Sequence, residues 1–247
     1  MSEPKIVLLS FTPHPIEVML FAAKNMHGKV PNSLEEFMAV DIPDRVKFDF
    51  MSYLAAEPLT GGVQEFVSTV WLLKNVSRAF QQQLTRHRSA AYSIQSLRIV
   101  PKEHFADDDA YHTPSNVKDS VRFGLSMDRI QNLYMMMLRN GENPEVARGI
   151  LPLNIHSPIT MSISLRHLTG LINARLCHMA QGEFQEVAKL MVGEVVGKMG
   201  KYFEVLFRPP CEDNRTCPHA DGCGRYLRSE WCETCKRTEQ LDKFLRS

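Results

Sequence analysis

The sequence feature that most constrains this chain is residues 76–98, which read VSRAFQQQLTRHRSAAYSIQSLR. The stretch holds four arginines, one histidine and four serines within 23 residues. If residues 77–88 form a helix, Gln83 lies one turn before Arg86 and His87, so the three side chains share one surface. Consecutive residues are about 100° apart around a helix, so Arg86, His87 and Arg88 fan out at its end. We expect such a fan to bind more than one anionic group.

The residues that follow, 92–100, are predicted to be extended. In an extended segment Ser96 and Arg98 lie on the same face, where a hydroxyl and a forked guanidinium suit a phosphate group. The tripeptide Arg-His-Arg by itself is more often part of a solvated basic face than of a binding site. The spacing of the whole stretch favours the binding site.

The remaining composition is that of an ordinary globular protein. The chain has 247 residues, of which 44% are hydrophobic and 23% charged, enough for one large domain or two small ones. Its formal net charge is +1, so anion binding has to be local rather than a property of the whole surface. The sequence has neither a membrane-spanning apolar run nor the pattern of a secretory signal, so we expect a cytoplasmic protein.

Hydrophobic patterns predict the main elements of secondary structure. Strands are expected at residues 5–10, 65–73 and 159–165, and helices at 16–27, 33–38, 44–56, 117–139, 166–180 and 181–207. Ser33 is predicted to cap the second helix, and Asn143 with Pro144 to begin a further short one. The last helix is apolar on more than one side, which is typical of subunit packing.

The spacing Arg-His-Arg, seven residues, then serine resembles the signature of the flavin-dependent thymidylate synthases. Here it stands as RHRSAAYSIQS, preceded by SRAFQQQ. Three further stretches are similar to the same family: TPHPIEVMLFAAKNM near the start, ARGILP at residues 147–152, and SLRHLTGLINARLCHMAQGEF at residues 164–184. The resemblance therefore extends over most of the chain before residue 185.

Several positions depart from the family pattern. The family's His-x-Ser/Thr-x-x-Glu-His stretch is represented only by Glu65, because Thr60, Gly62 and Phe66 occupy its other positions. Two positions that are usually asparagine carry Ser164 and Gly170. Two residues before Ser96, where the family usually has Glu or Gln, the chain has Ile94. Gln95 is displaced by one residue, which in a strand turns a side chain to the opposite face.

The resemblance implies an α+β fold, with a central mixed or antiparallel sheet and long helices, that assembles as a homotetramer with active sites shared between subunits. It implies FAD-dependent methylation of dUMP to dTMP, with methylenetetrahydrofolate as the one-carbon donor and NADPH as the reductant. The residues implied for dUMP are Gln83, Arg86, Ser96, Arg98, Arg148 and Arg175, with Arg175 as the catalytic group that stabilises negative charge on the pyrimidine. Those implied for FAD are Glu65, Arg86, His87, Arg88, Ser164 and Arg166.

Pro209 and Pro210 separate this catalytic domain, residues 1–210, from a Cys- and His-rich tail, residues 211–247. The tail is not part of the family pattern. We predict that it holds a structural zinc ion, with reduced thiols or disulfides as the alternatives. The predicted ligands are drawn from Cys217, His219, Cys223, Cys232 and Cys235.

Other functions stay open at this level. The same flavin and folate chemistry can act on another pyrimidine nucleotide, or transfer a different one-carbon group. A conventional thiolate mechanism would require Cys177, which we interpret as a buried packing residue. A non-catalytic nucleotide- or nucleic-acid-binding relative is disfavoured by the near-neutral net charge.

Overall fold

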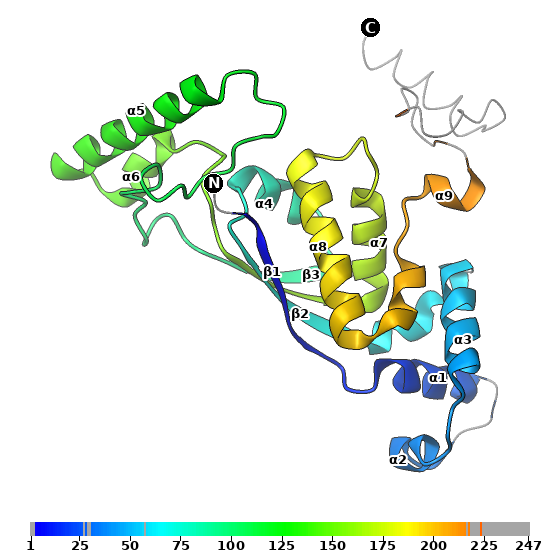
Figure 1. Ribbon diagram of the computed structural model, residues 1–247. Coiled ribbons are helices and arrows are strands. Elements are labelled where there is room, and N and C mark those ends of the chain that lie inside the picture. The colour runs from blue at the N-terminus through cyan, green and yellow to red at the C-terminus, as the bar shows by residue number, and fades with distance from the viewer. Residues whose placement is uncertain are drawn as a thin grey trace, which may run out of the picture.

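A computed structural model of the chain describes residues 3–26, 28, 31–56, 58–215, 217 and 223. Its centre is a sheet of four strands, β1 (Lys5–Phe11), β2 (Ser68–Lys74), β3 (Ala90–Ile94) and β4 (Ile159–Ser164). Their order in the sheet is β1-β2-β4-β3, and each neighbouring pair is antiparallel (Figure 1). The predicted α+β class with a central sheet is confirmed.

The helices lie around this sheet and mostly match the predicted ranges. They are α1 (Pro15–Met26), α2 (Leu34–Met38), α3 (Asp44–Ala56), α4 (Arg78–Leu84), α5 (Ser120–Arg139), α6 (Pro144–Ala147), α7 (Leu165–Arg175), α8 (Gly182–Met199) and α9 (Cys211–Asn214). Short 3-10 helices are η1 (Pro58–Phe66), η2 (Arg148–Ile150) and η3 (Lys201–Leu206). The predicted caps are confirmed, because Ser33 accepts from the Glu36 amide and Asn143 from the Glu145 amide.

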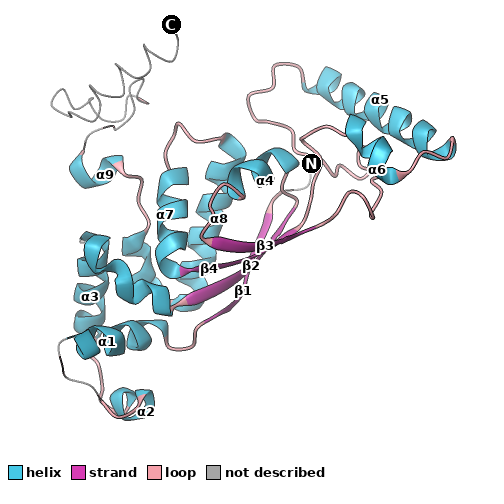
Figure 2. Cartoon of the chain, turned by 180° about the vertical axis from the view of Figure 1, so that it is seen from behind, coloured by secondary structure: helices cyan, strands magenta, loops and turns pink. Residues whose placement is uncertain are grey.

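Helices α7 and α8 cover one face of the sheet (Figures 1 and 2). Their apolar residues and those of the sheet belong to one buried core cluster. The alternation of β2 sends Thr69, Trp71 and Leu73 inward, where all three are fully buried. The Trp71 indole N–H donates to the Thr69 hydroxyl at 2.9 Å, and this hydroxyl donates to the Ile163 carbonyl at 2.8 Å. The polar atoms inside this core are therefore paired.

Residues between β3 and β4 form an arm that carries α5 and α6 away from the sheet (Figure 1). The arm has its own small hydrophobic cluster, which includes Leu97, Phe105, Met127 and Ile155. Inside it, the side-chain oxygen of Gln131 accepts from the Ala106 amide at 2.7 Å. The arm is thus packed well enough to hold the residues at its base in place.

Two predicted elements differ from the structure. The helix expected at 181–207 is broken at Gly200, whose φ of +111° cannot continue a helix, and η3 follows. Its first part, α8, packs against β1 of its own chain, so its apolar residues fill the core rather than a subunit contact. The strand expected at 65–73 begins only at Ser68, because β4 ends at Ser164, opposite Ser68, and leaves residues 65–67 no strand partner.

Candidate functional site

The Arg86-His87-Arg88 triplet lies in the turn between α4 and β3, not in a helix as predicted. Helix α4 ends at Leu84, and the hydroxyl of Thr85 donates a hydrogen bond to the Gln81 carbonyl at 3.0 Å. The Tyr92 hydroxyl lies 2.9 Å from the Leu84 carbonyl and 2.8 Å from the His87 carbonyl, so its single proton is shared between them. The turn therefore has a fixed shape, and burial raises the pKa of Tyr92 to about 12.

Arg175, at the last turn of α7, meets this turn. Its Nη2 lies 3.3 Å from Nε2 of His87, and its guanidinium lies 4.7 Å from the centre of the Phe184 ring. Burial and the nearby Arg86 lower the pKa of Arg175. Its buried Nε has no hydrogen-bond partner among the described residues. A buried donor of this kind is suited to a ligand oxygen.

His87 is the neutral member of this group. Burial first, and then the charge of Arg175, lower its pKa, so the imidazole is uncharged at neutral pH. In a neutral imidazole, Nε2 can accept a hydrogen bond from Arg175 only when the ring hydrogen is on Nδ1. We call Arg86, His87 and Arg175 the arginine–histidine cluster. It brings together two segments that the sequence places 88 residues apart.

A buried carboxylate, Glu183, supports this cluster through α4, although it was not predicted as a site residue. Glu183 accepts from the Ser77 amide at 2.6 Å and from its hydroxyl at 2.5 Å. The Ser77 hydroxyl in turn accepts from the Phe80 amide at 2.9 Å and caps α4. Ser77, near the start of the arginine-rich stretch, is thereby tied to α8. The only signal in the sequence is the glutamate of the AQGE segment.

Three residues predicted for FAD form a second group on the surface, with His167 as a fourth member. The Ser164 hydroxyl donates to Glu65 at 2.7 Å, and Arg166 lies 3.6 Å from the same carboxylate. Nδ1 of His167 lies 2.9 Å from Ser164 Oγ and 3.5 Å from Glu65, so a proton on Nδ1 satisfies both. A Cβ at Gly170, on the next turn of α7, would meet nothing within 4 Å. Open space therefore lies where the family usually carries an asparagine.

Ser96 and Arg98 lie in the turn after β3 rather than in the predicted extension of that strand. The ladder ends because Pro158, which precedes β4, has no N–H to donate, and the Gln95 amide makes the last contact to its carbonyl at 3.3 Å. Arg98 forms a bidentate ion pair with Glu145, at 2.8 and 3.0 Å.

Arg148, at the end of α6, belongs to a second basic group, to which α4 contributes Arg78 and the arm contributes Lys102. Its Nε donates to the Glu145 carbonyl at 3.2 Å, as expected for an arginine at a helix end. Burial and the charge of Arg148 lower the pKa of Arg78, and burial and Arg78 lower the pKa of Lys102. Like charges held this close favour an anion between them.

The predicted one-residue displacement places the side chains of Ile94 and Gln95 in different surroundings. Ile94 packs against the main core, while the side-chain oxygen of Gln95 is buried without a hydrogen-bond partner in the described part of the chain. Gln83 is half-buried and Arg88 is exposed. Gln95 was not predicted as a binding residue, and its unpaired buried oxygen is a free acceptor among the described residues.

Of the predicted metal ligands, only Cys217 and Cys223 fall within the described residues, and His219, Cys232 and Cys235 lie outside them. Within the described ranges, no group of three or more His, Cys, Asp or Glu side chains is arranged to hold a metal ion. No helix described here is long and apolar enough to cross a membrane.

An antiparallel sheet whose turns gather arginines, a neutral histidine and one buried guanidinium N–H without a partner among the described residues defines a protein suited to bind anionic organic ligands. The family model described as thymidylate synthase complementing protein matches residues 7–199, and the chain belongs to this family. The flavin-dependent thymidylate synthase of Nitratidesulfovibrio vulgaris is 28% identical over 243 residues, covering 91% of this chain and 96% of its own. That of Pyrococcus abyssi is 26% identical, with 94% and 98% covered.

Solved structures show the same fold. Thymidylate synthase X from Helicobacter pylori, in a crystal structure with FAD and dUMP, matches with a TM-score of 0.68 and 17% identity, covering 82% of this chain and 98% of that one. A UMP/dUMP methylase, PolB from Streptomyces cacaoi bound with 5-Br dUMP, matches with a TM-score of 0.63 and 17% identity, covering 83% and 94%. The resemblance stated from the sequence is confirmed.

Proposed function

We propose that this chain is a flavin-dependent thymidylate synthase, which methylates dUMP to dTMP with FAD as its cofactor. Its family and its relatives over nearly their whole length support this function. The observation that carries it is the arginine–histidine cluster, in which the Arg-His-Arg turn meets Arg175. The proposal includes methylenetetrahydrofolate as the carbon donor, NADPH as the reductant and a cytoplasmic location.

We assign the pyrimidine to Arg175. An arginine whose buried Nε lacks a partner can donate to a ring oxygen and stabilise the negative charge that develops on the ring during attack at C5. Partial burial of Arg175 strengthens this interaction because water screens it less. Gln83, Arg86, Ser96, Arg98 and Arg148 complete the proposed nucleotide site. We assign Ser96 a binding role in this site, where its hydroxyl accepts from the Arg98 amide at 3.3 Å.

We assign FAD to Arg86, His87 and Arg88 in the turn, and to the surface group of Glu65, Ser164 and Arg166. This group fits a polar ligand because its hydrogen bonds are short and its side chains are partly exposed. When bound, the flavin supplies the redox chemistry of the reaction. The residues themselves bind and orient it, and the neutral His87 adds no charge that would compete with its neighbouring arginines.

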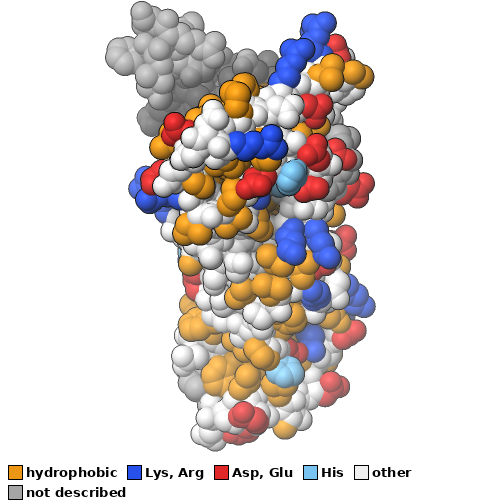
Figure 3. All heavy atoms as spheres, turned by 90° about the vertical axis from the view of Figure 1, so that its left-hand side faces the viewer, with side chains coloured by type: hydrophobic (Ala, Val, Ile, Leu, Met, Phe, Trp, Pro, Cys, Tyr) orange, Lys and Arg blue, Asp and Glu red, His pale blue; other side chains and the backbone are white. Residues whose placement is uncertain are grey.

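The assembly that we propose is a homotetramer with shared active sites. None of the described helices covers the sheet face opposite α7 and α8 (Figure 2). Leu9 on β1 is 53% exposed. The side of the molecule that faces left in Figure 1 shows hydrophobic side chains between charged ones (Figure 3). On α5, Val121, Leu125 and Leu133 are exposed as well. Such apolar surface is typical of subunit contacts.

Product formation tests this function directly. We expect dTMP from dUMP only when FAD, methylenetetrahydrofolate and NADPH are all present. Arg175→Ala should lower kcat/KM for dUMP by at least about 100-fold, as expected when a charge-stabilising donor is removed. Arg139→Ala, at an exposed position of α5, is the matched control and should leave the rate unchanged. Turnover of dUMP by the Arg175 variant at the wild-type rate would contradict the assignment.

A second candidate function is the same chemistry on another pyrimidine nucleotide. Two observations favour it: Ile94 is turned into the core, and the buried oxygen of Gln95 is unpaired in the described structure. An acceptor there can select a nucleotide that offers a hydrogen-bond donor. Comparing dUMP, UMP and dCMP as substrates separates the two functions. A preference for UMP or dCMP that Gln95→Leu abolishes would replace dUMP as the substrate.

A further inference from the structure

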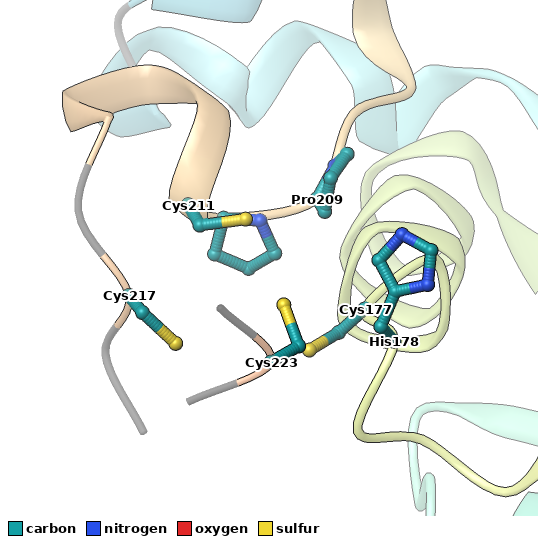
Figure 4. Close-up of a pocket in the computed structure, with 7 residues that line it drawn as sticks. Cys177, His178, Pro209, Cys211, Cys217 and Cys223 are labelled. Atoms are coloured by element: carbon teal, nitrogen blue, oxygen red, sulfur yellow. The ribbon is translucent and has the colours of Figure 1, made fainter. Parts of the chain in front are cut away.

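All four cysteines that the structure describes lie in one pocket. Cys177 comes from the segment after α7, Cys211 from the start of α9, and Cys217 and Cys223 from the tail. Figure 4 shows the sulfur atoms of Cys211, Cys217 and Cys223 turned toward the space between them, with Cys177 beside Cys223. Cys177, Cys211 and Cys217 are buried, at 8%, 6% and 3% exposure. The catalytic domain and the tail therefore contribute thiols to the same place.

The approach of the two segments is fixed by hydrogen bonds rather than by the cysteines alone. The Asn173 side chain on α7 donates to the Leu206 carbonyl at 2.9 Å and accepts from the Arg208 amide at 3.0 Å. This pair of bonds holds residues 206–208 against α7, so that Pro209 and Cys211 follow beside Cys177. The fold therefore places Cys177 and Cys211 in the same pocket.

We propose that Cys177, Cys211, Cys217 and Cys223 are the ligands of one structural Zn²⁺ site that fastens the start of the tail to the end of α7. Four thiolates at about 2.3 Å make the tetrahedral set that Zn²⁺ prefers in structural sites. Each thiol loses its proton on coordination, so binding releases protons to solvent without oxidation or reduction. The set differs from the one predicted from the sequence, because two of its four ligands belong to the catalytic domain or its boundary.

The described side chains do not yet have the spacing of a metal site. Binding therefore has to draw the sulfurs together, as structural zinc sites do when metal binding and local folding are coupled. Cys223 is the exposed member of the set, whereas Cys177 and Cys211 follow segments that Asn173 holds together. Cys177 lies two residues after Arg175, so the site would also fix the end of the helix that carries this arginine.

Zinc content of the purified full-length chain, prepared under reducing conditions, tests the ligand set. We expect one Zn²⁺ per chain by elemental analysis, and a thiolate-to-metal absorption band when Co²⁺ replaces it. Cys177→Ser and Cys211→Ser should each abolish the band and the stoichiometric metal. Cys232→Ser and Cys235→Ser are the matched controls, which should retain both. Thermal unfolding of each variant, with Cys177→Ala as a second substitution, separates loss of a ligand from loss of the fold.

Three results would overturn the proposal. Retention of full metal by Cys177→Ser or Cys211→Ser would show that the substituted thiol is not a ligand. Loss of metal in the Cys232 or Cys235 variant would transfer the site to the tail. A disulfide involving Cys177 in freshly prepared, non-reduced protein, detected by peptide mass spectrometry, would replace coordination by oxidation. FAD binding measured on the same samples is independent of these outcomes, so failure of the proposed enzyme function would be recognised separately.

Discussion

At the scale of single residues, the candidate site depends on groups that contact no ligand in our assignment. Glu183 illustrates this dependence, since its carboxylate accepts both the amide and the hydroxyl of Ser77 in the buried interior. Neither bond follows from sequence spacing, because the two residues are 106 positions apart. What could be predicted was the set of arginines. The buried contacts of Glu183 that help to position these arginines could not be predicted.

Substituting Glu183 tests this support. Glu183→Ala leaves a buried amide and a buried hydroxyl without their acceptor, which should cost about 2–4 kcal/mol of unfolding free energy. It should also raise KM for dUMP, because the Arg-His-Arg turn follows α4. Glu183→Gln keeps one acceptor and should recover part of both effects. Denaturant unfolding and steady-state kinetics measure them, with exposed Glu186→Ala on the same helix as the control. Equal behaviour of the two alanine variants would refute the role.

His156 predicts a specific dependence of stability on pH. Burial, with the nearby charges of His112 and Lys102, lowers its pKa from 6.5 to about 4. Between these values the unfolded chain binds a proton that the folded chain excludes, so stability falls as pH decreases from about 6.5 and levels off near 4. The loss should approach about 3 kcal/mol. Unfolding of His156→Asn across this range should lack that component, whereas exposed His104→Asn should retain it.

At the scale of elements, sequence periodicity predicted whether a segment is a helix or a strand more reliably than it predicted where the segment ends. The helix at 44–56 and the caps at Ser33 and Asn143 were placed correctly because local chemistry decides them. The ends of α4, β3 and α8 were not, because tertiary partners decide them: the Tyr92 hydroxyl, the proline before β4, and the backbone of Gly200. Several of the proposed binding residues, including Arg86, Ser96 and Arg98, lie just after α4 and β3.

Two glycines near the end of α8 should respond oppositely to the same substitution. Gly200 has a φ of +111°, which an L residue adopts only with strain, so Gly200→Ala should destabilise the fold by about 1–2 kcal/mol. Gly197 is helical, and a Cβ there meets nothing within 4 Å, so Gly197→Ala should stabilise it by up to about 1 kcal/mol. Thermal unfolding of both variants checks the signs. A stabilising Gly200→Ala would contradict the observed helix break.

At the scale of the whole molecule, the proposed nucleotide residues fall into groups on different parts of one chain. Arg175 contacts the Arg-His-Arg turn, whereas Arg98 and Arg148 are connected through Glu145 at the base of the arm. The resemblance to the family predicted the residues but not this partition, because a sequence pattern carries no information about which copies of a chain meet. A shared site between subunits explains why one nucleotide would need both groups.

Co-expression of two inactive variants tests shared sites. If Arg148 and Arg175 of one site come from different subunits, mixed assemblies of Arg148→Ala and Arg175→Ala should recover about one quarter of the wild-type sites at random mixing. Arg86→Ala with Arg175→Ala should recover none, because these residues meet within one chain. Sedimentation analysis gives the assembly state alongside. No recovery in the first mixture, despite tetramers, would place the whole site in a single subunit.

The most direct test of the central claim is the absorbance spectrum of the purified chain with FAD, followed by titration with dUMP. We predict a bound-flavin spectrum that shifts with dUMP and saturates at one nucleotide per flavin. The Arg175→Ala variant should bind FAD but respond to dUMP only at much higher concentration. A chain that binds no FAD, or a flavin spectrum that no pyrimidine nucleotide changes, would contradict the proposed function.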